Sequence, residues 1–170
     1  NKVSGTSVPR DFVELPSQIM ENWAADPEVL KVYARHYKTG EPIPQELIDK
    51  LENSGHFNQG FVTTEFMAAA LLDMAYHTRN TTDPVNPNEF EKATLEKIGL
   101  IPEITVRYRS PYFQHIFAGG YSSGYYAYTW AEVLDADAFE AFKETGNIFN
   151  PEKTKAFREN ILSKGGSEDA

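Results

Sequence analysis

The feature of this sequence that most constrains its fold is a helix-start signal that occurs at three places, Asp26-Pro27-Glu28, Ile43-Pro44-Gln45-Glu46 and Asn150-Pro151-Glu152. Proline suits the first turn of a helix because the N–H that it lacks would have no partner there, and an acid in that turn complements the helix dipole. Apolar residues follow each signal at helical spacing. We therefore expect short helices that each begin at their own cap.

The rest of the chain extends this pattern and predicts an all-α fold. Alternation typical of strands is nearly absent, and no β-hairpin signal occurs. A single helical domain over residues 1–170, with about six to eight helices, is expected. The expected helices are 11–23 with Asp11 as N-cap and Pro16 in the first turn, 26–40, 44–51 with Leu47, Ile48 and Leu51 inward, 60–77 as the central helix, 88–98 closed by Gly99, one helix or a pair after Trp130 up to Gly146, and 150–162.

Composition excludes several classes of function. The net charge of -9 argues against nucleic acid as a partner, because binding to phosphates needs a basic surface. The absence of cysteine leaves no disulfide or thiolate chemistry. The longest apolar run, residues 67–72, is far too short for a membrane span. We expect a soluble protein without a membrane partner, cytoplasmic, with the periplasm as the alternative.

Residues 112–130 hold five of the nine tyrosines, together with His115 and three glycines. If the segment after the Gly-Gly pair is helical, Tyr121, Tyr125 and Tyr128 share one face. Phenols stay protonated at neutral pH, so such a row offers hydrogen-bond donors to a peptide backbone or to a developing oxyanion. The alternative is a buried packing ridge, because aromatic residues at helical spacing also form cores. The residues alone predict a tyrosine ridge that faces a ligand.

Glu14 is the carboxylate with the most unusual setting, since Phe12, Val13 and Leu15 flank it. An apolar setting is costly for a charge unless the charge is paired or binds a metal. The alternative is a helix-start acid that the dipole favours. The four histidines show neither H-x-x-x-H nor H-E-x-x-H spacing, so this chain by itself offers no complete zinc site.

Two segments together resemble the thimet oligopeptidase and peptidyl-dipeptidase family of zinc metallopeptidases. Residues 11–18, Asp-Phe-Val-Glu-Leu-Pro-Ser-Gln, resemble its third-ligand region, and residues 115–130 resemble its substrate-binding tyrosine motif. Segments 58–61, 69–74, 131–137 and 158–166 are also similar in order and spacing. The lead-in at residues 4–12 and the spacing from His115 to Tyr121 look most like the bacterial peptidyl-dipeptidase branch. The resemblance implies the C-terminal part of a neurolysin-like catalytic domain.

The resemblance also implies roles for individual residues. Glu14 would be a zinc-ligating carboxylate, and His115 and Tyr121 would hold the substrate backbone or the transition state. Tyr125 and Tyr128 would complete the row of phenols, with Tyr128 as the oxyanion donor. The family's zinc activates a water molecule, and an H-E-x-x-H segment supplies two zinc ligands and the general base. That segment is expected upstream of residue 1.

These implications give a prediction for the parent protein and one for the isolated chain. The parent is expected to be a zinc metallopeptidase that hydrolyses short peptides and releases C-terminal dipeptides. Its partners are short peptide substrates and the missing N-terminal part of the same protein. The isolated chain is expected to be inactive and to hold zinc weakly, because a catalytic zinc site needs three protein ligands. A non-catalytic helical peptide-binding module is the alternative.

Overall fold

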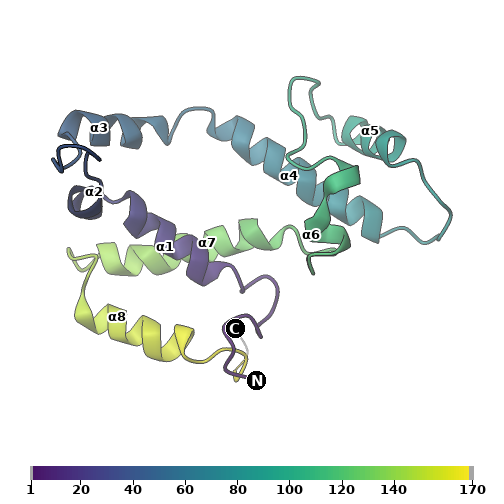
Figure 1. Cartoon of the computed structure of the whole chain (residues 1–170). Coiled ribbons are helices and arrows are strands. Elements are labelled where there is room, and N and C mark those ends of the chain that lie inside the picture. Colours follow the sequence, from purple (N-terminus) through teal and green to yellow (C-terminus); the bar gives the residue numbers. More distant parts are fainter. Residues whose placement is uncertain (1, 169–170) are drawn as a thin grey trace. The chain divides into compact units, whose positions relative to one another are not determined.

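The computed structural model describes residues 2–168, and the chain divides into two compact units, one formed by Asn1–Gly55 with Ala127–Ala170 and the other by His56–Tyr126. Every regular element in the described residues is helical (Figure 1). Extended pairing within residues 2–168 is limited to one isolated antiparallel bridge between Arg35 and Pro42. The predicted all-α fold is confirmed.

The first unit is built around helices α1 and α7, which pack against each other (Figure 1). Trp23 of α1 meets Phe139 and Phe142 of α7 edge-on, at ring-centroid distances of 4.8 and 4.9 Å, and its indole N–H donates to the Ile148 carbonyl. Offset or edge-on aromatic pairs add to the stability that burial already gives. The elements of this unit are α1 (Leu15–Ala25), α2 (Pro27–Tyr33), α3 (Gln45–Ser54), α7 (Ala127–Lys143), α8 (Pro151–Phe157) and the π-helical turn η2 (Arg158–Leu162).

The predicted helix starts are confirmed, and two of them are capped by side chains. Asp26 accepts a hydrogen bond from the Glu28 N–H at the start of α2, and Asn150 accepts from two N–H groups at the start of α8. Pro44 precedes α3 without a side-chain cap. Such caps satisfy N–H groups that have no partner inside the helix, which is why these short sequences fix the helix starts.

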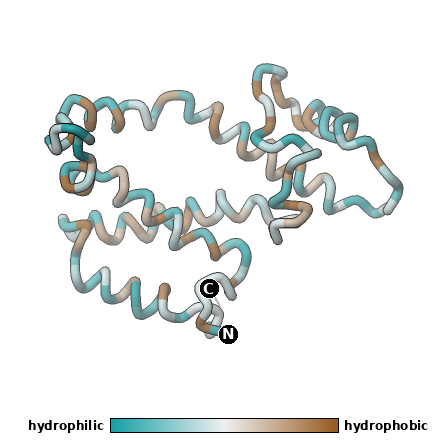
Figure 2. The backbone as a smooth tube through the Cα atoms, viewed as in Figure 1, coloured by the Kyte–Doolittle hydropathy of each residue, from teal (hydrophilic) through white to brown (hydrophobic). Residues whose placement is uncertain are grey.

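The second unit contains α4 (Gln59–His77), α5 (Pro87–Lys97), the 3-10 turn η1 (Ser110–Tyr112) and α6 (Gln114–Phe117). Hydrophobic residues recur along α4 (Figure 2), and Ala68 and Leu72 pack with Val106 in the core of this unit. The first half of α4 is exposed, so only its second half has the predicted central position. No helix within residues 2–168 combines the length and the apolar character that crossing a membrane requires.

Three local predictions were wrong. The N-cap of α1 is Glu14 rather than Asp11. The helix that starts at Pro27 ends at Tyr33, because the chain turns back to form the bridge at Arg35. In α3, Ile48 is fully buried, but Leu47 and Leu51, predicted to point inward, are 47% and 52% exposed. The buried face of α3 is therefore narrow and includes Ile48 but neither Leu47 nor Leu51, which the apolar pattern alone did not reveal.

The helix that was considered after the Gly-Gly pair does not form, because α7 begins only at Ala127. Residues 118–126, here called the tyrosine loop, form a series of turns. Gly120 has φ +82° and Ser123 has φ +55°, both in the left-handed region that a right-handed helix cannot contain. Tyr121 and Tyr125 therefore do not lie on one helical face with Tyr128.

Candidate functional site

Glu14 is half-buried at the residue that precedes α1, and its carboxylate does not cap the helix. The Ser17 hydroxyl lies 2.8 Å from Glu14 Oε2 and donates to it, and the same hydroxyl lies 2.9 Å from the Glu14 carbonyl oxygen. A helix-start acid that served the helix alone would use its carboxylate on the backbone N–H groups of the first turn. The local hydrogen bond instead orients the carboxylate, as partners of metal-ligating carboxylates do.

Tyr128 lies half-buried in the first turn of α7. Its carbonyl oxygen accepts a hydrogen bond of 3.1 Å from the side-chain amide of Gln18, which lies one turn into α1. The Gln18 side-chain oxygen is itself buried, and no residue within 2–168 provides a hydrogen-bond partner for it. The structure thus ties the helix that follows Glu14 to the turn that carries Tyr128, within the first unit.

The other three predicted site residues gather in one aromatic cluster in the second unit. The His115 ring lies 5.9 Å from the Tyr121 ring and 5.7 Å from the Tyr125 ring, measured between centroids. Tyr108, which the sequence did not single out, lies 4.9 Å from His115 and stacks on Phe113 at 5.3 Å. The only sequence signal for Tyr108 was an aromatic residue between two arginines, and that pattern is not specific.

Tyr125 is the most enclosed of the three predicted site residues in the cluster, at 2% exposure. Its ring stacks on Phe66 of α4 at 5.0 Å and meets Phe113 edge-on at 4.9 Å. Burial raises the pKa of the Tyr125 phenol to about 12, and the positive charge of Arg107 opposes that rise. Tyr125 therefore remains a neutral hydrogen-bond donor throughout the physiological pH range.

Backbone contacts shape the entry to the tyrosine loop. The Tyr121 N–H donates to the His115 carbonyl oxygen at 2.9 Å, and Gly119 N–H donates to the Gln114 carbonyl oxygen at 2.7 Å. A methyl group added at Gly119 would lie 2.8 Å from the His115 Cα atom. The backbone at Gly119 thus approaches that of His115 closely, and the turn brings Tyr121 back beside His115.

Asp73 is a charged residue within the apolar helix α4, and the sequence alone assigned it no role. Its side chain is fully buried and accepts hydrogen bonds from the Ser123 and Tyr125 N–H groups of the tyrosine loop. No sequence signal could identify these partners, because they lie 50 and 52 residues further along the chain.

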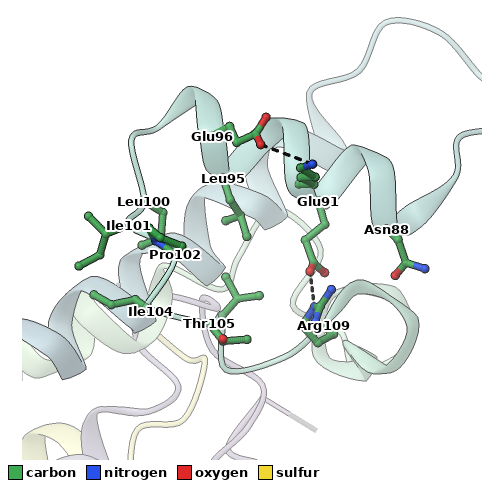
Figure 3. Close-up of a pocket in the computed structure, with 12 residues that line it drawn as sticks. Asn88, Glu91, Leu95, Glu96, Leu100, Ile101, Pro102, Ile104, Thr105 and Arg109 are labelled. Carbon is green, nitrogen blue, oxygen red and sulfur yellow. Dashed lines mark hydrogen bonds and ion pairs between the residues drawn. The ribbon is translucent and has the colours of Figure 1, made fainter.

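A second buried carboxylate, Glu91 of α5, holds the segment that leads into α6. It pairs with Arg109 and accepts hydrogen bonds from the N–H and the hydroxyl of Ser110. Figure 3 shows this pair at one end of a cavity of about 670 Å³ between α5 and residues 100–109. Apolar and polar side chains line the cavity in equal number, and none of the predicted site residues is among them. Glu91 is therefore a structural anchor.

The described residues do not assemble a metal centre of their own. No group of three or more His, Cys, Asp or Glu side chains within residues 2–168 is placed to hold a metal ion. Glu14 is compatible with a single zinc ligand, because it presents a carboxylate that a neighbouring hydroxyl orients. One carboxylate falls short of the three protein ligands that a catalytic zinc site uses.

A helical scaffold that carries an oriented carboxylate and a histidine–tyrosine cluster is consistent with a peptidase. Residues 1–170 match the sequence profile of peptidase family M3, so the chain belongs to that family. It is 47% identical to dipeptidyl carboxypeptidase of Escherichia coli (strain K12) over 169 residues, which are 98% of this chain and 25% of that protein. It is 44% identical to oligopeptidase A of the same organism over 98% of this chain and 25% of that protein.

More distant relatives extend the comparison to eukaryotes. Saccharolysin of Saccharomyces cerevisiae (strain ATCC 204508 / S288c) is 35% identical over 166 residues, which are 96% of this chain and 23% of that protein. The chain therefore spans about a quarter of the length of the curated relatives that it matches.

Proposed function

We propose that this chain is the C-terminal portion of a zinc-dependent peptidase that hydrolyses short peptides and releases C-terminal dipeptides. The observation that carries the proposal is the 47% identity to a dipeptidyl carboxypeptidase over 98% of this chain. This span includes Glu14, the His115 cluster and Tyr128. The similar identity to oligopeptidase A supports the peptidase class but not the dipeptide product. The release of dipeptides is therefore proposed separately from the peptidase activity itself.

Each site residue has a role in this proposal. Glu14 supplies one zinc ligand, and His115, Tyr121 and Tyr125 bind the substrate backbone through a ring nitrogen and phenol groups. Tyr128 donates a hydrogen bond to the oxyanion that develops on the scissile carbonyl. Zinc, when bound, activates a water molecule for attack on that carbonyl. The neutral phenol of Tyr125 supports a donor role, because an ionised phenol could not donate.

The remaining ligands are proposed to come from the rest of the parent polypeptide. Several large apolar side chains of this chain are strongly exposed, among them Phe57 at 77%, Val32 at 69% and Val62 at 53%. Exposed apolar groups of this size, present in each of the two units, support the proposal that other parts of the parent cover them. An H-E-x-x-H segment there would add two histidine ligands and a glutamate base. The isolated chain is accordingly proposed to be inactive.

The full-length parent enzyme provides the test. We expect about one zinc per chain by metal analysis, and we expect mass spectrometry to show that an N-acetylated pentapeptide loses a C-terminal dipeptide. Cleavage at an internal bond would retain the peptidase and contradict the dipeptide product. A parent that binds the peptide without cleaving it, and whose upstream sequence lacks H-E-x-x-H, would instead support a non-catalytic peptide-binding module.

The isolated chain tests the proposed division of the site. Incubated with zinc and the same pentapeptide, it is expected to show no hydrolysis above the metal-only control. Turnover comparable to that of the parent would contradict the proposal that essential ligands lie elsewhere.

A further inference from the structure

Asp73 carries a charge in the interior of the second unit. It lies in the buried half of α4, between Leu72 and Met74, and its side chain is 1% exposed. A carboxylate at such a position is costly unless hydrogen bonds replace the water that it has lost. The partners that Asp73 has acquired therefore indicate what this residue does.

The backbone of the tyrosine loop supplies those partners. Asp73 Oδ1 lies 3.0 Å from the Ser123 nitrogen, and Oδ2 lies 2.9 Å from the Tyr125 nitrogen, so each N–H donates to a different oxygen. Hydrogen bonds to an ionised acceptor are stronger than neutral ones, and two of them fix both position and orientation. The carboxylate thus holds the stretch that connects Tyr121 to Tyr125.

The loop needs this support because its backbone is strained at Ser123. Ser123 has φ +55°, a conformation that residues with a Cβ atom rarely adopt. A residue persists in such a conformation only where its surroundings enforce it. Its N–H is one of the two groups that Asp73 holds, so the strained residue and its restraint coincide.

His77 secures the carboxylate from one turn further along α4. Its Nδ1 atom lies 2.7 Å from Asp73 Oδ1 and 2.9 Å from the Asp73 carbonyl oxygen. Both neighbours are acceptors, so Nδ1 carries the proton and donates. The His77 ring also packs against Phe117, just before the tyrosine loop, at 5.9 Å. His77 therefore limits the rotation of the Asp73 side chain.

We propose that Asp73 is a positioning residue for peptide binding: its buried carboxylate sets the conformation in which the tyrosine loop presents Tyr121 and Tyr125, and His77 keeps that carboxylate in place. The inference rests on the proposed function for its catalytic consequence. The alternative is that Asp73 contributes only to the stability of the second unit.

The test uses the full-length, zinc-loaded parent with Asp73→Asn. An asparagine side chain turns its NH₂ group toward one of the two N–H donors, so one hydrogen bond is lost and a repulsive contact replaces it. We expect kcat/KM for a short peptide to fall about 100-fold, the size of effect that a small misplacement of binding groups produces. Zinc content should stay at the wild-type value, because Asp73 is not among the proposed ligands.

Asp135→Asn is the matched control. Asp135 is also a buried carboxylate, at 8% exposure, and it accepts a hydrogen bond from the side-chain amide of Asn22 rather than from the tyrosine loop. We expect it to lower the midpoint of thermal unfolding while kcat/KM per bound zinc changes by less than about threefold. Equal kcat/KM per bound zinc in Asp73→Asn and Asp135→Asn would overturn the positioning role.

Two further variants keep the test decisive if Asp73→Asn fails to fold. His77→Leu leaves the carboxylate present but removes its side-chain donor, and about a tenfold fall in kcat/KM is expected. Ser123→Gly, added to Asp73→Asn or to His77→Leu, removes the strain and is expected to restore activity about fivefold. A purely structural role predicts no such rescue, so its absence in a folded double variant contradicts the proposal.

Hydrogen exchange separates this inference from the proposed function. Amides of residues 118–126 should exchange faster in Asp73→Asn than in the wild-type parent, and this readout does not need peptidase activity. Unchanged exchange there would overturn the positioning role even if the parent is a peptidase. A wild-type parent that does not hydrolyse peptides, with faster loop exchange in the variant, would overturn the proposed function and retain Asp73 as the anchor of the loop.

Discussion

Glu14 and the tyrosine loop are held in place by different means. Glu14 accepts a hydrogen bond from Ser17, which lies three residues along the chain, in the first turn of α1. The loop receives its restraint from Asp73, which is 50 residues away from Ser123. A local partner is fixed as soon as the helix forms, whereas a distant partner requires the whole second unit to fold first. Substitutions near Glu14 are therefore expected to affect zinc binding, whereas substitutions in the tyrosine loop are expected to affect peptide hydrolysis while zinc is retained.

The largest effect is expected from Glu14→Gln in the parent enzyme. An amide ligates zinc far more weakly than a carboxylate, so we expect zinc to be lost and kcat/KM to fall more than about 100-fold, beyond what changes to the outer partners of a ligand cause. Metal analysis of the dialysed protein and peptide hydrolysis measure the two outcomes. Glu21→Gln, on an exposed part of α1, is the control. Full zinc content in Glu14→Gln would contradict the proposed role of Glu14.

The next largest effect is expected from Gly119→Ala. The new methyl group would lie 2.8 Å from the His115 Cα atom, and that neighbour is backbone that cannot rotate away. The turn must therefore shift, and we expect kcat/KM to fall about tenfold while zinc is retained. Gly60→Ala is the matched control, because its added methyl meets no atom of the residues that the structure describes within 4 Å. Equal peptide hydrolysis by the two variants would show that the turn tolerates movement.

Ser17→Ala tests the local side of the comparison and should have a smaller effect. The variant removes the hydroxyl that donates to Glu14 Oε2, but a water molecule can take its place at a half-exposed carboxylate. We expect zinc affinity, measured by competition with a chelator, to weaken about threefold to tenfold, at or below the lower end of the range for such partners. A loss as large as that of Glu14→Gln would mean that Ser17 does more than orient the carboxylate.

The smallest effect on stability is expected from Tyr125→Phe, and this effect on stability appears only at alkaline pH. The folded chain keeps the Tyr125 proton up to a pKa of about 12, whereas an unfolded phenol titrates near about 10. Between these two pH values the folded state binds more protons than the unfolded state. The contribution of Tyr125 to the free energy of unfolding is therefore complete below about pH 10 and is lost as the pH rises towards about 12. Tyr125→Phe should weaken this dependence and remove one late-titrating phenolate from the ultraviolet absorbance titration. An unchanged titration curve would contradict the buried state of Tyr125.

The sequence by itself determined those features that depend on near neighbours. Asp26 and Asn150 cap their helices as predicted, because a side chain and the N–H groups two or three residues later meet whenever the first turn forms. The all-α fold followed from the same signals. Resemblance to known peptidases supplied the roles of Glu14, His115, Tyr121, Tyr125 and Tyr128, and these stay predictions.

Only the tertiary structure decided how the tyrosines are presented. Helical spacing suggested one face for Tyr121, Tyr125 and Tyr128, but left-handed backbone at Gly120 and Ser123 interrupts the helix before Ala127. That conformation is stable because Asp73 binds the loop backbone across 50 and 52 residues of sequence. Helical periodicity describes only which residues share a face within one element. A buried carboxylate such as that of Asp73 also needs hydrogen-bond donors, and only the tertiary structure shows which distant N–H groups supply them.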